Sequence, residues 1–306
     1  MLDPTYNEER GRGWNVQTDG SRLVERTLEY QFLGMLTAEL LRRGLRYEVL
    51  RGDIDLDGHD IVVETDGIAR HIQLKAVAEG GKTREVPINL ALASKPSGCV
   101  LWMTYDPARF TITGWRWFGG VPGARLPHLG NKPGKHSRAN SQGIKAPRLN
   151  TRILATRAFT NLLDIADVTD ALFGTPSLQL LRQALRNKPA EMSQPLWLGR
   201  VRKGDFRSVP QDLTWSEALD MAHMIDGYDL AEKLGLGDPT AYAERQLASA
   251  TETGTWAGDG AELWVTLFLE HRRWKFSSPH EPEPGTMRLL DGLVRQLRFA
   301  LTGEQV

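Results

Sequence analysis

Residues 60–75, which read DIVVETDGIARHIQLK, predict a β-hairpin around which the rest of the domain can be built. An Asp-Gly pair favours a two-residue turn between antiparallel strands. If Asp66 and Gly67 form that turn, every residue of the first strand has a defined partner on the second, and Asp60 lies opposite Gln73. The position of the turn therefore predicts the strand register.

Side chains alternate between the two faces of a strand, so the hairpin has one apolar and one polar face. The apolar face carries Ile61, Val63, Ile68, Ile72 and Leu74. The other face carries Asp60, Gln73 and Lys75, together with Val62 and Glu64. Facing residues have Cβ atoms about 5 Å apart, so a carboxylate and an amide oxygen can hold one divalent cation with an ammonium group next to them.

Helical and strand patterns surround the hairpin. Apolar residues recur at helical spacing from Leu23 to Arg43, and Gly44 fits the end of that helix. The chain further predicts a strand over residues 46–51, a passage from strand to helix over residues 86–98, and a buried strand over residues 99–105. This order indicates a mixed α/β (α+β) domain with a sheet of three or four strands. The Gly- and Pro-rich residues 119–147 are expected to be irregular.

After Gly174 the patterns are helical only. The expected helices are one from the capping box of Thr214 and Glu217 towards Leu234, one from Asp238-Pro239, and two over residues 261–276 and 287–301. We therefore expect an α/β domain over residues 1–174 and an all-α domain over residues 175–306. The tryptophans of the second domain are expected to form its core.

The amino-acid composition excludes few classes of protein. The 306 residues carry no net charge, and 41% are hydrophobic and 25% charged, as in ordinary soluble proteins. The N-terminus is polar and acidic rather than basic and then apolar, and no stretch reaches the roughly 18 apolar residues of a membrane span. We therefore expect a cytoplasmic protein without a membrane segment. The lone Cys99 excludes an internal disulfide and is expected to be a small buried residue.

Charge is unevenly distributed along the chain. No acidic residue occurs between Asp106 and Asp164. The same interval contains ten basic residues: Arg109, Arg116, Arg125, Lys132, Lys135, Arg138, Lys145, Arg148, Arg152 and Arg157. The stretch KPGKHSRANSQGIK, with Lys132, Lys135, Arg138 and Lys145, suits a loop laid along a sugar-phosphate backbone. The alternative is that these basic groups pair with the acidic C-terminal half.

A helix with Glu29, a hairpin with a D…QxK pattern and a following strand resemble the PD-(D/E)XK nuclease superfamily, which has the restriction-endonuclease-like fold. The resemblance extends from about Leu23 to Asp106. In that superfamily a helix supplies a glutamate, the first hairpin strand an aspartate, and the second strand an acid or glutamine followed two positions later by lysine. The matching positions in this chain are Glu29, Asp60, Gln73 and Lys75.

The resemblance implies a mixed sheet flanked by helices and a metal-dependent endonuclease. Its metal ligands are Asp60, Gln73 and Glu29, the metal is Mg²⁺ with Mn²⁺ as a substitute, and the carbonyl of Leu74 is a further ligand. Lys75 then orients or deprotonates water, or stabilises the charge that develops on the phosphoryl group. Gln73 stands where an acid is usual, as in methylation-directed restriction nucleases and some predicted bacterial defence nucleases. Because an amide adds no charge, metal affinity depends on Asp60 and the helix carboxylate.

The implied substrate is DNA, and the implied role is bacterial defence or restriction. RNA is an equal fit to these residues, because the distinction depends on contacts to the 2′-hydroxyl. Lys95 follows a helical pattern that in such folds runs beside the scissile phosphate, so it is expected to contact the backbone. A homodimer is implied only by the resemblance, because cleavage of both strands commonly uses two copies.

Several alternatives remain open from the sequence. The hairpin can be an ordinary one with a surface ion pair between Asp60 and Lys75, or the fold can bind nucleic acid without turnover. Glu25 can replace Glu29, and Asp55 is a second acid close to the site, in a stretch that also suits a solvated turn. His71 and the run Trp115–Phe118 are expected to serve local hydrogen bonding and core packing rather than chemistry.

Overall fold

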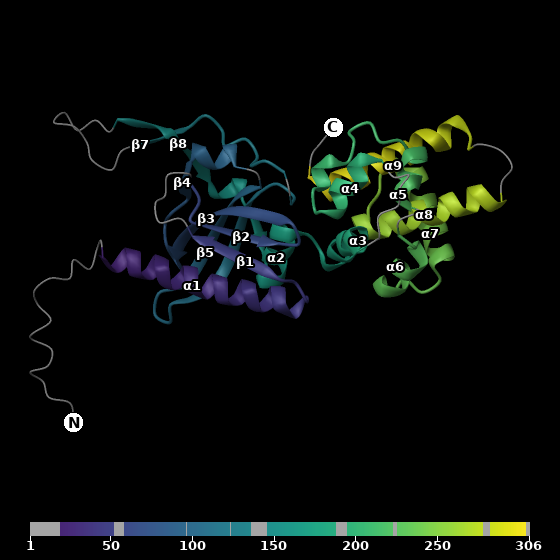
Figure 1. Ribbon diagram of the computed structural model, residues 1–306. Helices are drawn as coiled ribbons and strands as arrows, with labels where there is room; N and C mark the ends of the chain where they lie inside the picture. The colour runs from purple at the N-terminus through teal and green to yellow at the C-terminus, as the bar shows by residue number, and fades with distance from the viewer. Residues whose placement is uncertain are drawn as a thin grey trace, which may run out of the picture.

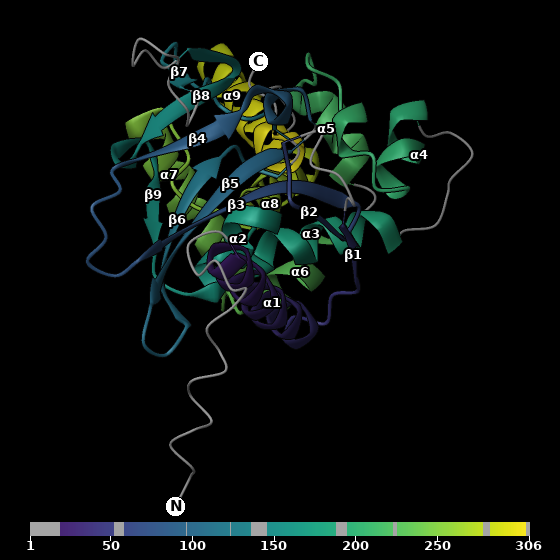
Figure 2. The same cartoon turned by 90° about the vertical axis from the view of Figure 1, so that its left-hand side faces the viewer.

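The computed structural model describes residues 19–51, 58–95, 97–122, 124–135, 146–187, 195–222, 225–277 and 282–303. The N-terminal part is a mixed β-sheet region, and the C-terminal part is mainly helical (Figure 1). Seen from the side, the main sheet lies between helix α1 and a smaller sheet formed by β4, β8 and β7 (Figure 2). No helix within the described ranges is long and apolar enough to cross a membrane.

The elements of the N-terminal part follow one another along the chain as helices, strands and short 3₁₀ turns. They are α1 (Asp19–Arg42), β1 (Tyr47–Arg51), β2 (Ile61–Thr65), β3 (Ile68–Ala78), β4 (Glu85–Asn89), the 3₁₀ turn η2 (Leu90–Ser94), β5 (Gly98–Asp106), β6 (Thr111–Gly119), β7 (Pro133–Lys135), β8 (Pro147–Ala155), the 3₁₀ turn η3 (Thr156–Ala158), β9 (Thr160–Leu162) and α2 (Ile165–Phe173).

The main sheet has the strand order β1-β2-β3-β5-β6-β9. Strands β3 and β5 run parallel, and the other neighbours are antiparallel. The predicted hairpin register is confirmed: Thr65 pairs with Ile68, and Ile61 pairs with Ile72. The turn residues have φ values of 53° at Asp66 and 74° at Gly67, as a tight turn of the primed type requires.

Helix α1 covers one face of the main sheet. Its residues Leu28, Phe32, Leu36 and Leu40 are fully buried against the apolar face of the hairpin and against β5 and β6. The helix ends at Arg42, and the predicted stop residue Gly44 follows it with a φ of 70°, a left-handed conformation that glycine adopts without strain. Cys99 lies in this core with no exposed surface, and burial raises the pKa of its thiol to about 12.

The opposite face of the sheet is also apolar over much of its area, which the sequence did not predict. A cluster that includes Val100, Trp102 and Phe118 packs there against β4 and β8. The expected three- or four-stranded sheet is therefore wrong, since the described chain forms a six-stranded and a three-stranded sheet. The expected passage from strand to helix over residues 86–98 is present as β4 followed by η2, which is a short 3₁₀ turn rather than an α-helix. It ends at Ser94, because Lys95 adopts an extended conformation ahead of Pro96, and a proline disfavours a helical residue before it.

The described C-terminal part contains helices α3 (Pro176–Asn187), α4 (Leu196–Arg202), η4 (Phe206–Ser208), α5 (Trp215–Ala222), α6 (Gly227–Leu234), α7 (Pro239–Thr253), α8 (Gly260–Ser277) and α9 (Pro284–Thr302). The predicted capping box is confirmed, because the Thr214 N–H donates to Glu217 Oε2 at 2.9 Å and the Glu217 N–H donates to Thr214 Oγ1 at 3.3 Å. The expected single helix to Leu234 is wrong, since Asp226 caps a new helix, α6.

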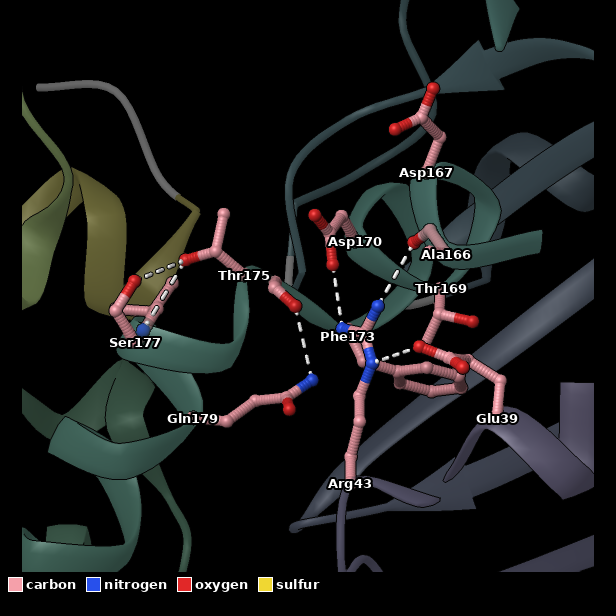
Figure 3. Close-up of polar contacts among 12 residues, drawn as sticks. Glu39, Arg43, Ala166, Asp167, Thr169, Asp170, Phe173, Thr175, Ser177 and Gln179 are labelled. Carbon is pink, nitrogen blue, oxygen red and sulfur yellow. Dashed lines mark hydrogen bonds and ion pairs between the residues drawn. The ribbon is translucent and has the colours of Figure 1, made fainter. Parts of the chain in front are cut away.

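The two parts have separate apolar clusters, which divide near Gly174. Figure 3 shows the polar contacts at this junction. Arg43 donates to Glu39 at 2.7 Å and to Asp170 at 2.6 Å, which ties the end of α1 to α2 (Figure 3). Gly174, with a φ of 92°, ends α2, and Gln179 of α3 donates back to its carbonyl at 3.0 Å.

Candidate active site

Asp60 lies directly before β2 and is fixed to the backbone of β3. Its N–H donates to the carbonyl of Ile72 at 2.9 Å. Its Oδ2 accepts a hydrogen bond from the N–H of Leu74 at 2.6 Å. These bonds go to the residues on either side of Gln73 in the chain. The carboxylate is therefore held against the backbone of β3 next to Gln73, at the open end of the hairpin.

Gln73 is buried and has an unsatisfied oxygen. The residue is 4% exposed, and its Oε1 atom has no hydrogen-bond partner. A buried acceptor without a partner costs about 1–3 kcal/mol relative to one that is satisfied. Such groups are rare in native proteins, and an ion that binds there is one of the ordinary explanations.

Lys75 lies on the same face as Gln73, two residues further along β3. It pairs with Trp102 of β5, which in turn pairs with Arg116 of β6. The guanidinium carbon of Arg116 is 5.3 Å from the centre of the Trp102 ring. Lys75 has no hydrogen-bond or ion-pair partner among the described residues. Two cationic side chains therefore flank Trp102 on the face of the sheet that carries Gln73.

Two histidines border the same site. The rings of His59 and His71 are 5.0 Å apart between centroids and meet edge to face at 89°. The Nδ1 atom of His59 is buried without a hydrogen-bond partner. His59 was not predicted as a site residue, although its position next to Asp60 was a usable signal. Arg116 could not be placed in the site, because the row from Lys75 to Arg116 depends on the parallel pairing of β3 and β5, which no local pattern encodes.

The segment between β3 and β5, which contains β4 and η2, packs closely against two glycines near the site. A Cβ on Gly58 would lie 2.7 Å from Cβ of Asn89, which caps η2. A Cβ on Gly98 would lie 2.5 Å from the carbonyl oxygen of Leu92. Glycine at both positions lets β4 and η2 pack closely onto the start of β5 and the residues before Asp60.

Glu29 lies on α1 with its side chain 12% exposed and forms ion pairs with two arginines. Its carboxylate is 3.2 Å from Arg26 and 3.1 Å from Arg51. Arg51 pairs with Ile61 across β1 and β2, so Glu29 is at the same end of the hairpin as Asp60 but on the side of the sheet covered by α1. Glu25, the alternative, is exposed.

The predicted phosphate contacts are only partly described. Lys95 is half-buried and directly follows η2. Lys132 is exposed and pairs with Glu85 of β4 at 2.6 Å, so this basic residue has an acidic partner from its own domain. Lys135 is exposed at the end of β7. Arg138 and Lys145 lie outside the described residues, as do Asp53, Asp55 and Asp57.

The side chains present fit part of a site for a hard divalent cation. Within the described ranges no group of three or more His, Cys, Asp or Glu residues is placed to hold a metal ion. Mg²⁺, however, is commonly bound by one or two carboxylates, with water and substrate phosphate as its remaining ligands. The carboxylate of Asp60 and the unsatisfied oxygen of Gln73 are donors of the required type.

Comparisons of the chain with protein-family models, with curated proteins and with solved structures found no match.

Proposed function

We propose that this protein is a metal-dependent endonuclease that hydrolyses phosphodiester bonds in DNA. Two observations on neighbouring residues carry the proposal: the Oε1 of Gln73 is buried and unsatisfied, and the carboxylate of Asp60 accepts a hydrogen bond from the N–H of Leu74, the next residue. Lys75 extends from the same face without an ionic partner in the described part of the chain. An acid, an amide oxygen and an amine on one hairpin form a set of groups suited to binding a cation next to a phosphate.

The topology is consistent with a restriction-endonuclease-like fold. Helix α1 precedes an antiparallel meander of three strands, β1 to β3, and β5 returns parallel to β3 after a crossover. The resemblance implies this order, although a β-strand and a 3₁₀ turn take the place of its crossover helix. A role in bacterial defence, a cytoplasmic location and a homodimer that cuts both strands belong to the same proposal.

In the proposed mechanism Asp60 and Gln73 would hold Mg²⁺, with Mn²⁺ as a substitute. Glu29, which the resemblance adds as a ligand, is paired with Arg26 and Arg51 on the α1 side of the sheet. The bound cation would offset negative charge on the phosphoryl group and lower the pKa of a water molecule. Lys75 orients the attacking water or donates a hydrogen bond to the phosphoryl oxygens. Arg116 adds positive charge in the same row of the sheet, which favours binding of the anionic backbone.

One observation favours a second candidate, a nucleic-acid-binding module without turnover. Glu29 is neutralised by Arg26 and Arg51, so the carboxylate that lies next to Gln73 in the proposed site is that of Asp60 alone among the described residues. A site with a single carboxylate binds Mg²⁺ weakly unless the substrate phosphate contributes. RNA in place of DNA remains part of the first proposal, since the same groups would act on either backbone.

Cleavage of defined substrates tests the proposal. The protein is incubated with modified and unmodified plasmid, single-stranded DNA and RNA, each with Mg²⁺, Mn²⁺ or a chelator. We expect cleavage of DNA that requires the metal, and we expect Lys75→Ala to lose it while binding DNA nearly as well as the parent.

Lys82→Ala, which changes an exposed lysine in the loop after β3, is the matched control and should cleave normally. Binding without cleavage of any substrate would support the second candidate. Equal cleavage by Lys75→Ala and the parent would contradict the proposed role of Lys75.

A further inference from the structure

A cavity of about 350 Å³ lies between the tip of the hairpin and the helical part. One side of the cavity is formed by the hairpin and by the segment before β5. The other side is formed by the segment between α4 and η4, by η4 and by the end of α9. Its walls include Gly67, Ala69, Ser97, Arg182, Phe206 and Thr302. This volume is in the range of small-molecule sites.

Arg182 lines this cavity with an unsatisfied donor. It is 1% exposed, and its Nε atom has no hydrogen-bond partner. The remaining guanidinium bonds go to backbone carbonyls, at 3.1 Å from Phe173 and 3.0 Å from Leu301. No carboxylate pairs with Arg182 in the described part of the chain.

Arg70 presents a second buried guanidinium close to the first. It is fully buried, donates to the carbonyls of Ala171 at 2.8 Å and Gly120 at 2.9 Å, and leaves its Nη1 without a partner. Burial lowers the pKa of Arg70 to about 10, and burial together with the charge of Arg70 lowers the pKa of Arg182 to about 10. Several of the carbonyls lie at the ends of α2 and α9, where the helix dipole supplies only a partial negative charge of about half a unit. Buried charges are normally paired, and neither guanidinium forms an ion pair with a carboxylate among the described residues.

Two carboxylates lie near the cavity, and neither forms an ion pair with the buried arginines in the described part of the chain. Asp205 lines the cavity and accepts a hydrogen bond from Ser208 at 2.6 Å. Asp66, in the hairpin turn, forms an ion pair with Arg186 of α3. Neither carboxylate bonds to Arg70 or Arg182 within the described residues. Arg207 is a second arginine in the cavity wall.

We propose that the cavity binds a small organic phosphate, with its phosphate group on Arg182 and Arg207. Guanidinium groups match phosphate geometry, and the buried Nε atom of Arg182, in the wall of the cavity, is a donor that no group in the described residues satisfies. Phe206, Leu301 and Ile68 offer an apolar wall for the organic group. A bound ligand contacts both the hairpin that carries Lys75 and the helical part, so it fixes the tip of the hairpin against the C-terminal helices.

Calorimetric titration without added metal tests the site, with adenosine 5′-monophosphate, inorganic phosphate and adenosine as probes. We expect the nucleotide to bind to the full-length protein, phosphate to bind more weakly, and adenosine not to bind. Removing one guanidinium contact should weaken nucleotide binding about tenfold in Arg207→Ala, the loss that corresponds to a single such contact. Arg200→Ala, an exposed arginine of α4, is the matched control and should bind like the parent.

A second variant, Ala69→Leu, fills the cavity and leaves every arginine in place, so it separates loss of binding from loss of folding. We expect it to unfold at the parent temperature and to bind no nucleotide. Absence of nucleotide and phosphate binding to the parent at millimolar concentration would overturn the proposal. So would equal binding by Ala69→Leu and the parent, or equal binding of adenosine and the nucleotide.

Discussion

Replacing Gln73 with methionine should stabilise this protein in the absence of metal. Methionine has nearly the same length as glutamine and carries no amide oxygen. Gln73 is 4% exposed and its Oε1 is unsatisfied, so the parent bears the desolvation cost of that acceptor in full. Removing a buried, unsatisfied acceptor should return about 1–3 kcal/mol. For a protein of this size, each kcal/mol shifts Tm by about 2–4 °C, so we expect an increase of roughly 2–12 °C.

Thermal unfolding in excess chelator measures this effect. The matched control is Gln179→Met, because Gln179 is also buried, at 3% exposure, but its amide donates to the carbonyl of Gly174 at 3.0 Å. Loss of that satisfied bond should destabilise the control by about 1 kcal/mol. A lower Tm for Gln73→Met, or a change equal to that of Gln179→Met, would refute the reasoning. It would mean that the oxygen of Gln73 is satisfied in the native protein and is not held open for a cation.

Three further results are expected. The hydrogen bonds and charges of Arg42 and Arg43 lower the pKa of Glu39 from its ordinary value near 4.5 to about 2. The contribution of Glu39 to stability is therefore complete above pH 4.5 and is lost as the pH falls towards 2. Glu39→Gln should flatten the pH dependence of Tm across that window, and an unchanged profile would contradict the assignment. Cys99 is fully buried with a raised pKa, so a thiol reagent should modify the native protein only as fast as it unfolds, and rapid labelling at neutral pH would contradict its placement. Lys135→Ala should reduce the salt dependence of DNA binding by up to about 0.9 in the logarithmic slope. Lys132→Ala should reduce it less, because Glu85 already neutralises Lys132. Equal slopes for the two variants would contradict this difference between the two lysines.

Local signals predicted the hairpin and helix α1 from the sequence. The Asp66-Gly67 pair defines the turn, and the alternation of side chains then defines the register and the two faces. The end of α1 also has a local cause, because Gly44 adopts a positive φ that does not continue a right-handed helix. The placement of Gln73 and Lys75 on one face of β3 could be predicted, because it depends only on the alternation of side chains along the strand.

Features that depend on distant pairing could not be predicted in the same way. The second sheet forms because β4 pairs with β8, more than 50 residues later, and no local pattern specifies that partner. Its packing buries Trp102 and encloses Gln73, which the hairpin alone would leave on an exposed face. The ion pair between Arg51 and Glu29 could likewise not be predicted, since Arg51 reaches the helix only once β1 has paired with β2.

Binding of a divalent cation by Asp60 and Gln73 is the central claim, and calorimetric titration of Mn²⁺ into the metal-free protein tests it most directly. Asp60→Asn is the informative variant, because it keeps an acceptor for the N–H of Leu74 and removes the negative charge. Glu64→Gln, an exposed carboxylate on the same strand, is its control. We predict that the parent and Glu64→Gln bind Mn²⁺ and that Asp60→Asn does not. A parent protein that binds no Mn²⁺, or an Asp60→Asn variant that binds it as tightly as the parent, would contradict the claim.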